Sequence, residues 1–205
     1  MDKRTLILDA LQDLLREGKA GTASVADIAK KAGIAKGGMY YYFKSKEEAL
    51  DALAQRQYAD VIEGCRQALE SSNADALTRL KMLLHIYRST AVDASVDIML
   101  HQPENAAIHQ KSMADIVRGL SPLLAGILRQ GHAEKLFSCD APEEYAEVML
   151  SFLVFLLDPG LFTWTEQETA RKLRAFARFL EKSLCAPENS FAFLHEGWTR
   201  QTLKN

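Results

Sequence analysis

Apolar residues recur along most of this chain at the three- and four-residue spacing of amphipathic helices. Only five prolines and eleven glycines occur in 205 residues, and no stretch alternates polar and apolar residues around a hairpin dipeptide. The pattern therefore predicts an all-α fold. The first helix is expected to end near Gly18, and its apolar side is marked by Ile7, Leu11, Leu14 and Leu15.

Caps and prolines predict where the later helices begin. Ser45 and Glu48 form an S-x-x-E capping box that should start a long helix reaching Leu69. Pro103 and Pro122 interrupt apolar segments, and each can occupy the first turn of a new helix. Further helices are expected from residue 72 or 73 onward, and over 96–101, 104–120, 122–130, 140–157 and 166–184. The tail is too apolar for a solvated end and should pack on the fold through Phe191, Phe193, Leu194 and Trp198.

The stretch over residues 24–46 reads as two short helices joined by a tight turn. An apolar stripe on the first of them is formed by Val25, Ile28, Ala29 and Ala32. Ser24 and Asp27 resemble a capping box, and Gly33 can adopt the left-handed conformation that ends a helix. On the second helix we expect Met39 and Phe43 to form the buried pair.

The residues left on the outer face of the second helix are small, cationic or hydroxyl-bearing: Lys36, Gly37, Gly38, Tyr40, Tyr41, Tyr42 and Lys44. Five lysines and one aspartate give residues 24–46 a charge of +4, whereas the formal net charge of the chain is -2. Phosphates attract cations and hydroxyls, and a helix entering the major groove needs small residues at its closest approach. These features favour a helix-turn-helix that binds duplex DNA over a merely solvated helix face.

The run from about Leu6 to Leu50 resembles the DNA-binding domain of TetR/AcrR-type transcriptional regulators. The resemblance is carried by Ala29, by the run AGIAKGGMYYYF over residues 32–43, and by Lys46, Glu47 and Leu50. It covers roughly the first quarter of the chain. Gly38 departs from the family pattern, which more often has a small polar residue there. Glycine removes a possible base contact and adds about 1 kcal/mol of helix penalty, so we expect the recognition helix to order fully only on DNA.

The chain is expected to divide into a DNA-binding domain over residues 1–46 and a larger ligand-binding and dimerisation domain over residues 47–205. Its 48% hydrophobic content suffices for such cores, and a pI of about 6.2 argues against indiscriminate coating of nucleic acid. Three widely spaced cysteines suit a reduced, cytoplasmic compartment. We do not expect the N-terminus to be a signal peptide, and the longest apolar run, over 148–157, is too short to cross a membrane.

No nucleophile elbow, P-loop, zinc-protease motif or dinucleotide fingerprint occurs, so neither an enzyme nor a cofactor is expected. His101 and His109 are eight residues apart across a proline, which is not a metal-ligand spacing. Three hypotheses stand: a ligand-responsive regulator, by preference a repressor; a DNA-binding regulator or architectural protein with no small-molecule ligand; and, least favoured, a helical-bundle enzyme. The 155 or so residues beyond the DNA-binding module exceed what dimerisation needs and favour the first.

We expect the chain to contact operator DNA, a second copy of itself and a small-molecule effector. Operator DNA should be contacted by Thr22, Ser24, Lys36, Gly37, Gly38, Tyr40, Tyr41, Tyr42 and Lys46. A two-fold homodimer should form through the helices over 143–157 and 166–184, because residues 148–157 of the first helix are apolar nearly all round. A pocket for a hydrophobic or aromatic effector should be lined by Met82, Tyr87, Met99, His101, His109, Met113, Met149 and Phe152. In the proteins that this chain resembles, the ligand changes the pitch of the helix that follows the DNA-binding module.

Overall fold

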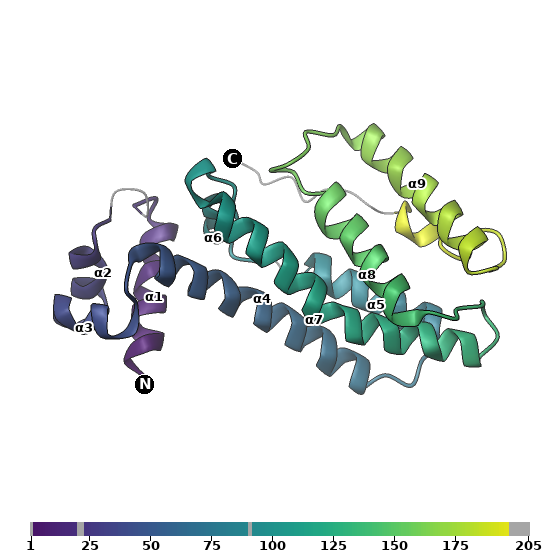
Figure 1. Ribbon diagram of the computed structural model, residues 1–205, viewed down its shortest axis with the longest axis horizontal. Coiled ribbons are helices and arrows are strands. Elements are labelled where there is room, and N and C mark those ends of the chain that lie inside the picture. The colour runs from purple at the N-terminus through teal and green to yellow at the C-terminus, as the bar shows by residue number, and fades with distance from the viewer. Residues whose placement is uncertain (1, 20–22, 90–91, 197–205) are drawn as a thin grey trace. The chain divides into compact units, whose positions relative to one another are not determined.

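The computed structural model describes residues 2–19, 23–89 and 92–196, and these residues form helices and connecting turns without a strand (Figure 1). This confirms the all-α prediction. The long helices are α1 (Lys3–Arg16), α4 (Lys46–Glu70), α5 (Ala76–Ser89), α7 (Ala106–Ala133), α8 (Pro142–Ser151) and α9 (Glu166–Ser183). The short ones are α2 (Val25–Lys31), α3 (Lys36–Tyr42), α6 (Ala94–Leu100), η1 (Pro103–Asn105), η2 (Phe152–Leu156) and η3 (Ala192–Leu194).

The chain forms two compact units, one made of residues 1–61 and 91–115 and the other of residues 62–90 and 116–205. Helices α4 and α7 each contribute residues to both units. The first unit therefore holds more than the helix-turn-helix, because α6 and the first part of α7 pack with it. The domain boundary expected at residue 46 stays a prediction.

The first unit is built around one apolar cluster. Ile7 and Leu11 of α1, Ile28 of α2 and Met39 of α3 are fully buried in it, and Phe43 is 2% exposed. α4 adds Leu53, and α6 adds Val96 and Leu100. The expected burial of Met39 and Phe43 is confirmed, and α1 contributes its apolar side to the same cluster.

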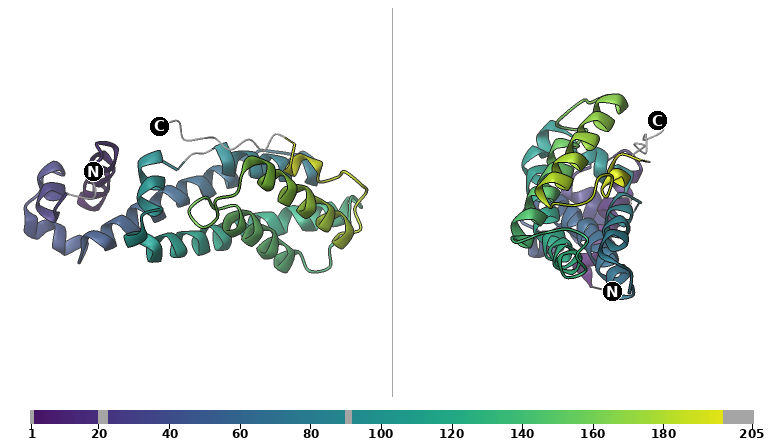
Figure 2. Two further views of the ribbon diagram at one scale, coloured as in Figure 1. Left: turned by 90° about the horizontal axis from the view of Figure 1, so that it is seen from above. Right: turned by 90° about the vertical axis from the view of Figure 1, so that its right-hand side faces the viewer.

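The second unit joins the later part of α4, α5, the later part of α7, α8 and α9. Phe152, the first residue of η2, stacks on Phe176 of α9 with 3.8 Å between ring centroids, and α8 and α9 lie side by side (Figures 1 and 2). The apolar tail packs as expected, because Phe191 is fully buried and its ring lies 6.1 Å from that of Phe137. Trp198 lies outside the described residues.

Pro122 does not break the helix, contrary to the expectation of two helices over 104–120 and 122–130. α7 runs from Ala106 to Ala133 with this proline inside it. The buried positions Ile116, Leu120, Leu124 and Leu128 keep the helical spacing across the proline. Their packing outweighs the penalty of about 3 kcal/mol that an interior proline carries.

Several helix ends shift by a few residues from the expected bounds, whereas the expected end of the helix over 140–157 at Asp158 holds. α5 begins at Ala76 and not at residue 72 or 73, because the carboxylate of Asp75 accepts the backbone N–H of Thr78 at 2.9 Å. After Ser151 the helix over 142–151 continues as a π-helical turn, η2. Asp158 then ends it, with its Oδ1 accepting the backbone N–H groups of Gly160 and Leu161.

Candidate nucleic-acid interface

Local interactions build the corner between α2 and α3. The Ser24 hydroxyl accepts the amide of Asp27 at 3.3 Å, and the Asp27 carboxylate accepts the amide of Ser24 at 2.8 Å, which completes a capping box. Hydrogen bonds from the Ser24 side chain and backbone hold the pKa of Asp27 below its ordinary value. Gly33 has φ +69° and ends α2, and the amide of Ile34 then bonds to the carbonyl of Ala29 at 2.9 Å.

The outer face of α3 presents Lys36, Gly37, Tyr40 and Tyr41, with Tyr40 49% and Tyr41 83% exposed. Tyr42 was expected to point outward with them, but it is half-buried and packs against the apolar cluster. It lies three residues after Met39, so it occupies the core side of the helix. Its ring meets that of Tyr41 edge-on, with 5.0 Å between centroids.

The remaining expected DNA contacts lie around α3. Ser24 is exposed at the start of α2, Gly38 is half-buried on α3, and Lys46 is half-buried at the first position of α4. Thr22 lies outside the described residues. The roles of these residues in DNA binding stay predictions.

The two glycines of α3 have no structural requirement for a small residue. A Cβ atom added to Gly37 would meet nothing within 4 Å, and one added to Gly38 would meet only Ile34 at 3.9 Å. Neither has a positive φ. The protein interior therefore does not explain why these positions lack a side chain, whereas close approach to a DNA groove would.

Part of the local positive charge is neutralised by Glu17, the residue that follows α1. The Glu17 carboxylate pairs with Lys19 at 2.9 Å and with Lys31 at 2.5 Å, and these hydrogen bonds lower its pKa to about 2. Glu17 lies outside residues 24–46, so the charge of +4 does not include it. Lys30, Lys36 and Lys44 remain exposed around the corner.

The expected effector-binding residues fall in both units. In the first unit Met99 and His109 are buried, while His101 and Met113 are half-buried. In the second unit Met149 is fully buried, while Met82, Tyr87 and Phe152 are half-buried. Each side chain has the partial or full burial that a pocket wall or a packed core would give. Their role as a ligand site stays a prediction.

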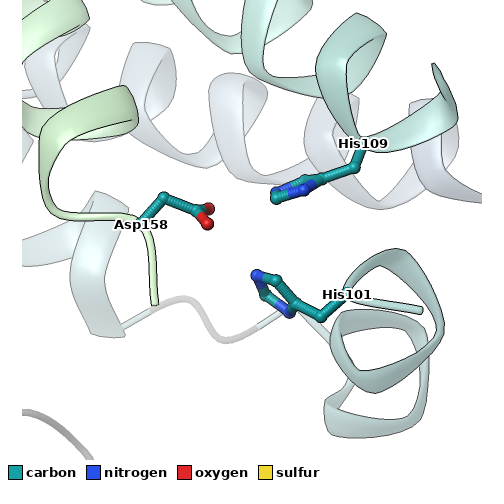
Figure 3. Close-up of side chains that lie close together, drawn as sticks. All are labelled: His101, His109 and Asp158. Atoms are coloured by element: carbon teal, nitrogen blue, oxygen red, sulfur yellow. The ribbon is translucent and has the colours of Figure 1, made fainter. Parts of the chain in front are cut away.

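His101 and His109 are brought together although they stand eight residues apart. Their rings meet edge-on with 4.7 Å between centroids (Figure 3). His101 caps the end of α6 and His109 lies in the first turn of α7. The turn η1 between them is held by Asn105, whose side-chain amide donates to the carbonyl of Met99 at 2.8 Å. Sequence spacing alone did not reveal this contact.

The second unit exposes a set of large apolar side chains on α8, η2 and α9. Val148 is 55%, Phe155 52% and Phe179 54% exposed. On the other side of the same segment Met149, Leu150, Leu153 and Val154 are buried. The expectation that residues 148–157 are apolar on both sides is therefore confirmed. We call Val148, Phe155 and Phe179 the apolar face.

A further feature was missed from the sequence. Arg174, Arg178 and Lys182 line a groove between α9 and the residues that follow it. Their i, i+4, i+8 spacing was visible as a cationic stripe. The groove itself was not, because it depends on how the tail folds back.

Within the described part of the chain, no helix is both long enough and apolar enough to cross a membrane.

Comparisons with known proteins agree with the assignment of a helix-turn-helix to the N-terminal part of the chain. Residues 7–53 match the family model for bacterial regulatory proteins of the tetR family, and residues 88–179 match a tetracyclin repressor-like C-terminal domain. The fatty acid metabolism regulator protein of Bacillus subtilis is 30% identical over 129 residues, which cover 61% of this chain and 66% of that protein. The transcriptional repressor KstR2 of Rhodococcus jostii is 28% identical over 149 residues, covering 70% of this chain and 72% of that protein.

The solved structures similar to this chain include the regulator FadR of Bacillus subtilis in complex with stearoyl-CoA. It is 25% identical, with a TM-score of 0.59, and the match covers 95% of this chain and 99% of that one. Together with the two family models, this likeness extends over both units of the fold. The chain belongs to the TetR family of bacterial transcriptional regulators.

Proposed function

We propose that this protein is a transcriptional repressor that binds operator DNA as a homodimer and leaves it when a mostly apolar small molecule binds. The exposed face of α3 is the observation that carries the proposal. It combines a lysine, two glycines without structural need and two exposed tyrosines on a helix whose opposite side is anchored by Met39. That combination suits the major groove and its flanking phosphates.

The contacts with DNA divide into two groups. Lys36, Tyr40, Tyr41 and Lys46 bind phosphates, with Ser24 adding a contact at the start of α2. Phosphate contacts give affinity that is similar for all sequences and falls with salt. Gly37 and Gly38 let the backbone of α3 approach base edges, so changes there alter the preferred sequence.

Two copies are needed for genomic discrimination, because one module covers too few base pairs. The apolar face supplies the interface. Its exposed side chains lie on α8, η2 and α9, and the stacking of Phe152 on Phe176 joins η2 to α9. A second copy covers this surface by two-fold symmetry.

The effector class that we favour is a fatty acyl thioester. Support comes from the Bacillus subtilis relative, named for fatty acid metabolism, and from the similar structure solved with stearoyl-CoA. The expected lining, rich in methionine and aromatic side chains, suits a flexible acyl chain. α4 follows α3 directly, so a change in its pitch moves the recognition helix. A ligand that prefers the non-binding state by about 1.4 kcal/mol shifts the equilibrium tenfold.

The test is selection from a pool of random duplexes at moderate salt, followed by a binding titration with the enriched sequence. We expect one enriched motif with two-fold symmetry, and about tenfold weaker binding for Lys36→Gln or Tyr40→Ala. Arg66→Gln is the matched charge control, because Arg66 is half-exposed on α4 and pairs only with Glu63 at 3.7 Å among the described residues. A pool without enrichment would exclude sequence-specific binding.

The effector is tested on the same complex. Stearoyl-CoA should release the enriched duplex, whereas coenzyme A without an acyl chain should not. If a broad set of apolar ligands leaves the complex intact, the protein is a DNA-binding regulator without a small-molecule effector.

A further inference from the structure

A groove of about 680 Å³ lies between the second half of α9 and the residues that follow it, all within the second unit. The chain turns sharply after α9, because Cys185 has φ +48° and the amide of Ala186 bonds back to the carbonyl of Glu181 at 2.8 Å. Asn189, with φ +64°, turns it again. The returning segment reaches η3 and faces α9, and the volume lies within the range of small-molecule sites.

Cations line one wall of this groove. Arg174, Arg178 and Lys182 are exposed, lie one helical turn apart, and span about 12 Å along α9. Among the described residues none of the three forms an ion pair. The lining also holds two carboxylates, of which Glu181 is already engaged by the backbone N–H of Phe191 at 3.2 Å. Glu188 is the other, so the cations outnumber the acids.

The opposite wall offers an unsatisfied polar atom. His195 lines the groove, and its Nδ1 is buried without a hydrogen-bond partner among the described residues. A buried polar atom without a partner costs about 1–3 kcal/mol. A ligand with acceptor or donor groups in the groove would satisfy this atom and the cations together.

We propose that this groove binds a small molecule bearing phosphate groups, held by Arg174, Arg178 and Lys182. The planar guanidinium groups bind phosphate oxygens in pairs, and lysine adds a point charge. Cations about 6 Å apart suit a ligand with more than one phosphate position, such as a nucleotide or a coenzyme A derivative. The site is separate from the helix-turn-helix residues, and Phe179 of the apolar face lies about 100° around α9 from Arg178.

Cys185 provides a direct reporter, because it lines the groove and is exposed. Cys65 and Cys139 are buried, and burial raises the pKa of Cys65 to about 11 and that of Cys139 above its ordinary value. A neutral alkylating reagent such as iodoacetamide therefore labels Cys185 in the folded protein. The labelling rate, followed by mass spectrometry, is measured at low salt with increasing acetyl-CoA, ATP or inorganic pyrophosphate.

At least one of these probes should slow the labelling saturably. Arg178→Gln and Arg174→Gln should each weaken that protection about tenfold, whereas Arg66→Gln on α4 should leave it unchanged. Protection by pyrophosphate alone identifies the phosphates as the recognised group. Protection by ATP or acetyl-CoA without protection by pyrophosphate identifies a nucleotide-bearing ligand. Comparing ATP with acetyl-CoA then distinguishes a nucleotide from a coenzyme A derivative.

Three results would overturn the proposal: no saturable protection by any probe, equal loss of protection in Arg66→Gln, or protection only by duplex DNA. The proposal goes beyond the repressor function and is tested apart from it. Both groove variants should still bind the enriched operator duplex, so failure of the groove and failure of operator binding are distinguishable.

Discussion

The guanidinium of Arg16 on α1 binds the carboxylate of Asp93, the residue that caps α6, through Nε at 2.7 Å and Nη2 at 2.7 Å. Oδ1 of the same carboxylate accepts the backbone N–H of Ser95 at 3.0 Å, and Gln12 donates to Oδ2 at 3.1 Å. One side chain thus joins the first helix to the cap of α6 within the first unit.

Replacing Asp93 by Asn should lower the free energy of unfolding by about 1–3 kcal/mol, because the charge-assisted bonds to Arg16 are lost. The matched control is Asp13→Asn, since Asp13 lies 3.7 Å from the same guanidinium but is 54% exposed. Its effect should stay below about 0.5 kcal/mol. Urea unfolding of the two variants measures the difference, and equal effects would contradict the assigned role.

The same carboxylate predicts a pH dependence. Burial acts to raise the pKa of Asp93, but hydrogen bonds from Ser95, Arg16 and Gln12 outweigh it and lower the pKa from 3.8 to about 2. The unfolded chain therefore binds this proton first as the pH falls. The stabilisation, about 2 kcal/mol, is complete above about pH 4 and is lost as the pH falls towards 2. The free energies of unfolding of wild type and Asp93→Asn, measured at several pH values, should converge as the pH falls from about 4 towards 2.

Two glycines of α7 should respond oppositely to the same substitution. A methyl group at Gly131 would overlap the ring of Phe137, which is buried against Phe191 and cannot easily move. Gly131→Ala should destabilise the fold by about 1–3 kcal/mol. A Cβ atom at Gly126 meets nothing within 4 Å, so Gly126→Ala should stabilise it by up to about 1 kcal/mol. Thermal unfolding of the two variants measures whether each substitution raises or lowers the stability of the fold.

Features set by neighbouring residues were predictable from the sequence. The capping box of Ser24 and Asp27, the left-handed Gly33 and the buried pair Met39 and Phe43 each depend on residues within one helical turn or one corner. The family motif also lies in a continuous stretch. The local helix signals and the family motif therefore both predict the helix-turn-helix.

Features set by packing between distant segments were not predictable. Pro122 stays inside α7 because the buried positions on both sides of it share one face. The pairing of Glu17 with Lys31 joins the residue after α1 to the end of α2, and the contact of His101 with His109 depends on the turn η1 between them. Periodicity reports which face of a helix is apolar, but not which distant segment covers it.

The apolar face gives a test of dimerisation. Phe179→Glu should yield a monomer in sedimentation velocity at micromolar concentration, because a charge would be buried at the interface. Phe176→Glu would be a poorer test, since Phe176 is 5% exposed and stacked on Phe152, so the fold itself would suffer. Ile98→Glu is the control, because Ile98 is as exposed as Phe179 but lies on α6. Loss of the dimer in both variants would point to another interface.

The glycines of α3 give the sharpest test of DNA recognition, because stability and binding should move in opposite directions. Alanine at Gly37 or Gly38 fits the fold without strain and should raise the free energy of unfolding by up to about 1 kcal/mol. The same methyl group should hinder approach to the groove, so operator affinity falls or the preferred sequence changes. Gly64→Ala in α4 is the control, since its Cβ atom also meets nothing within 4 Å and should stabilise the fold without altering DNA binding. Thermal unfolding without DNA and duplex selection measure the two effects. If both α3 variants select the wild-type operator with unchanged affinity, α3 does not enter the groove through these glycines.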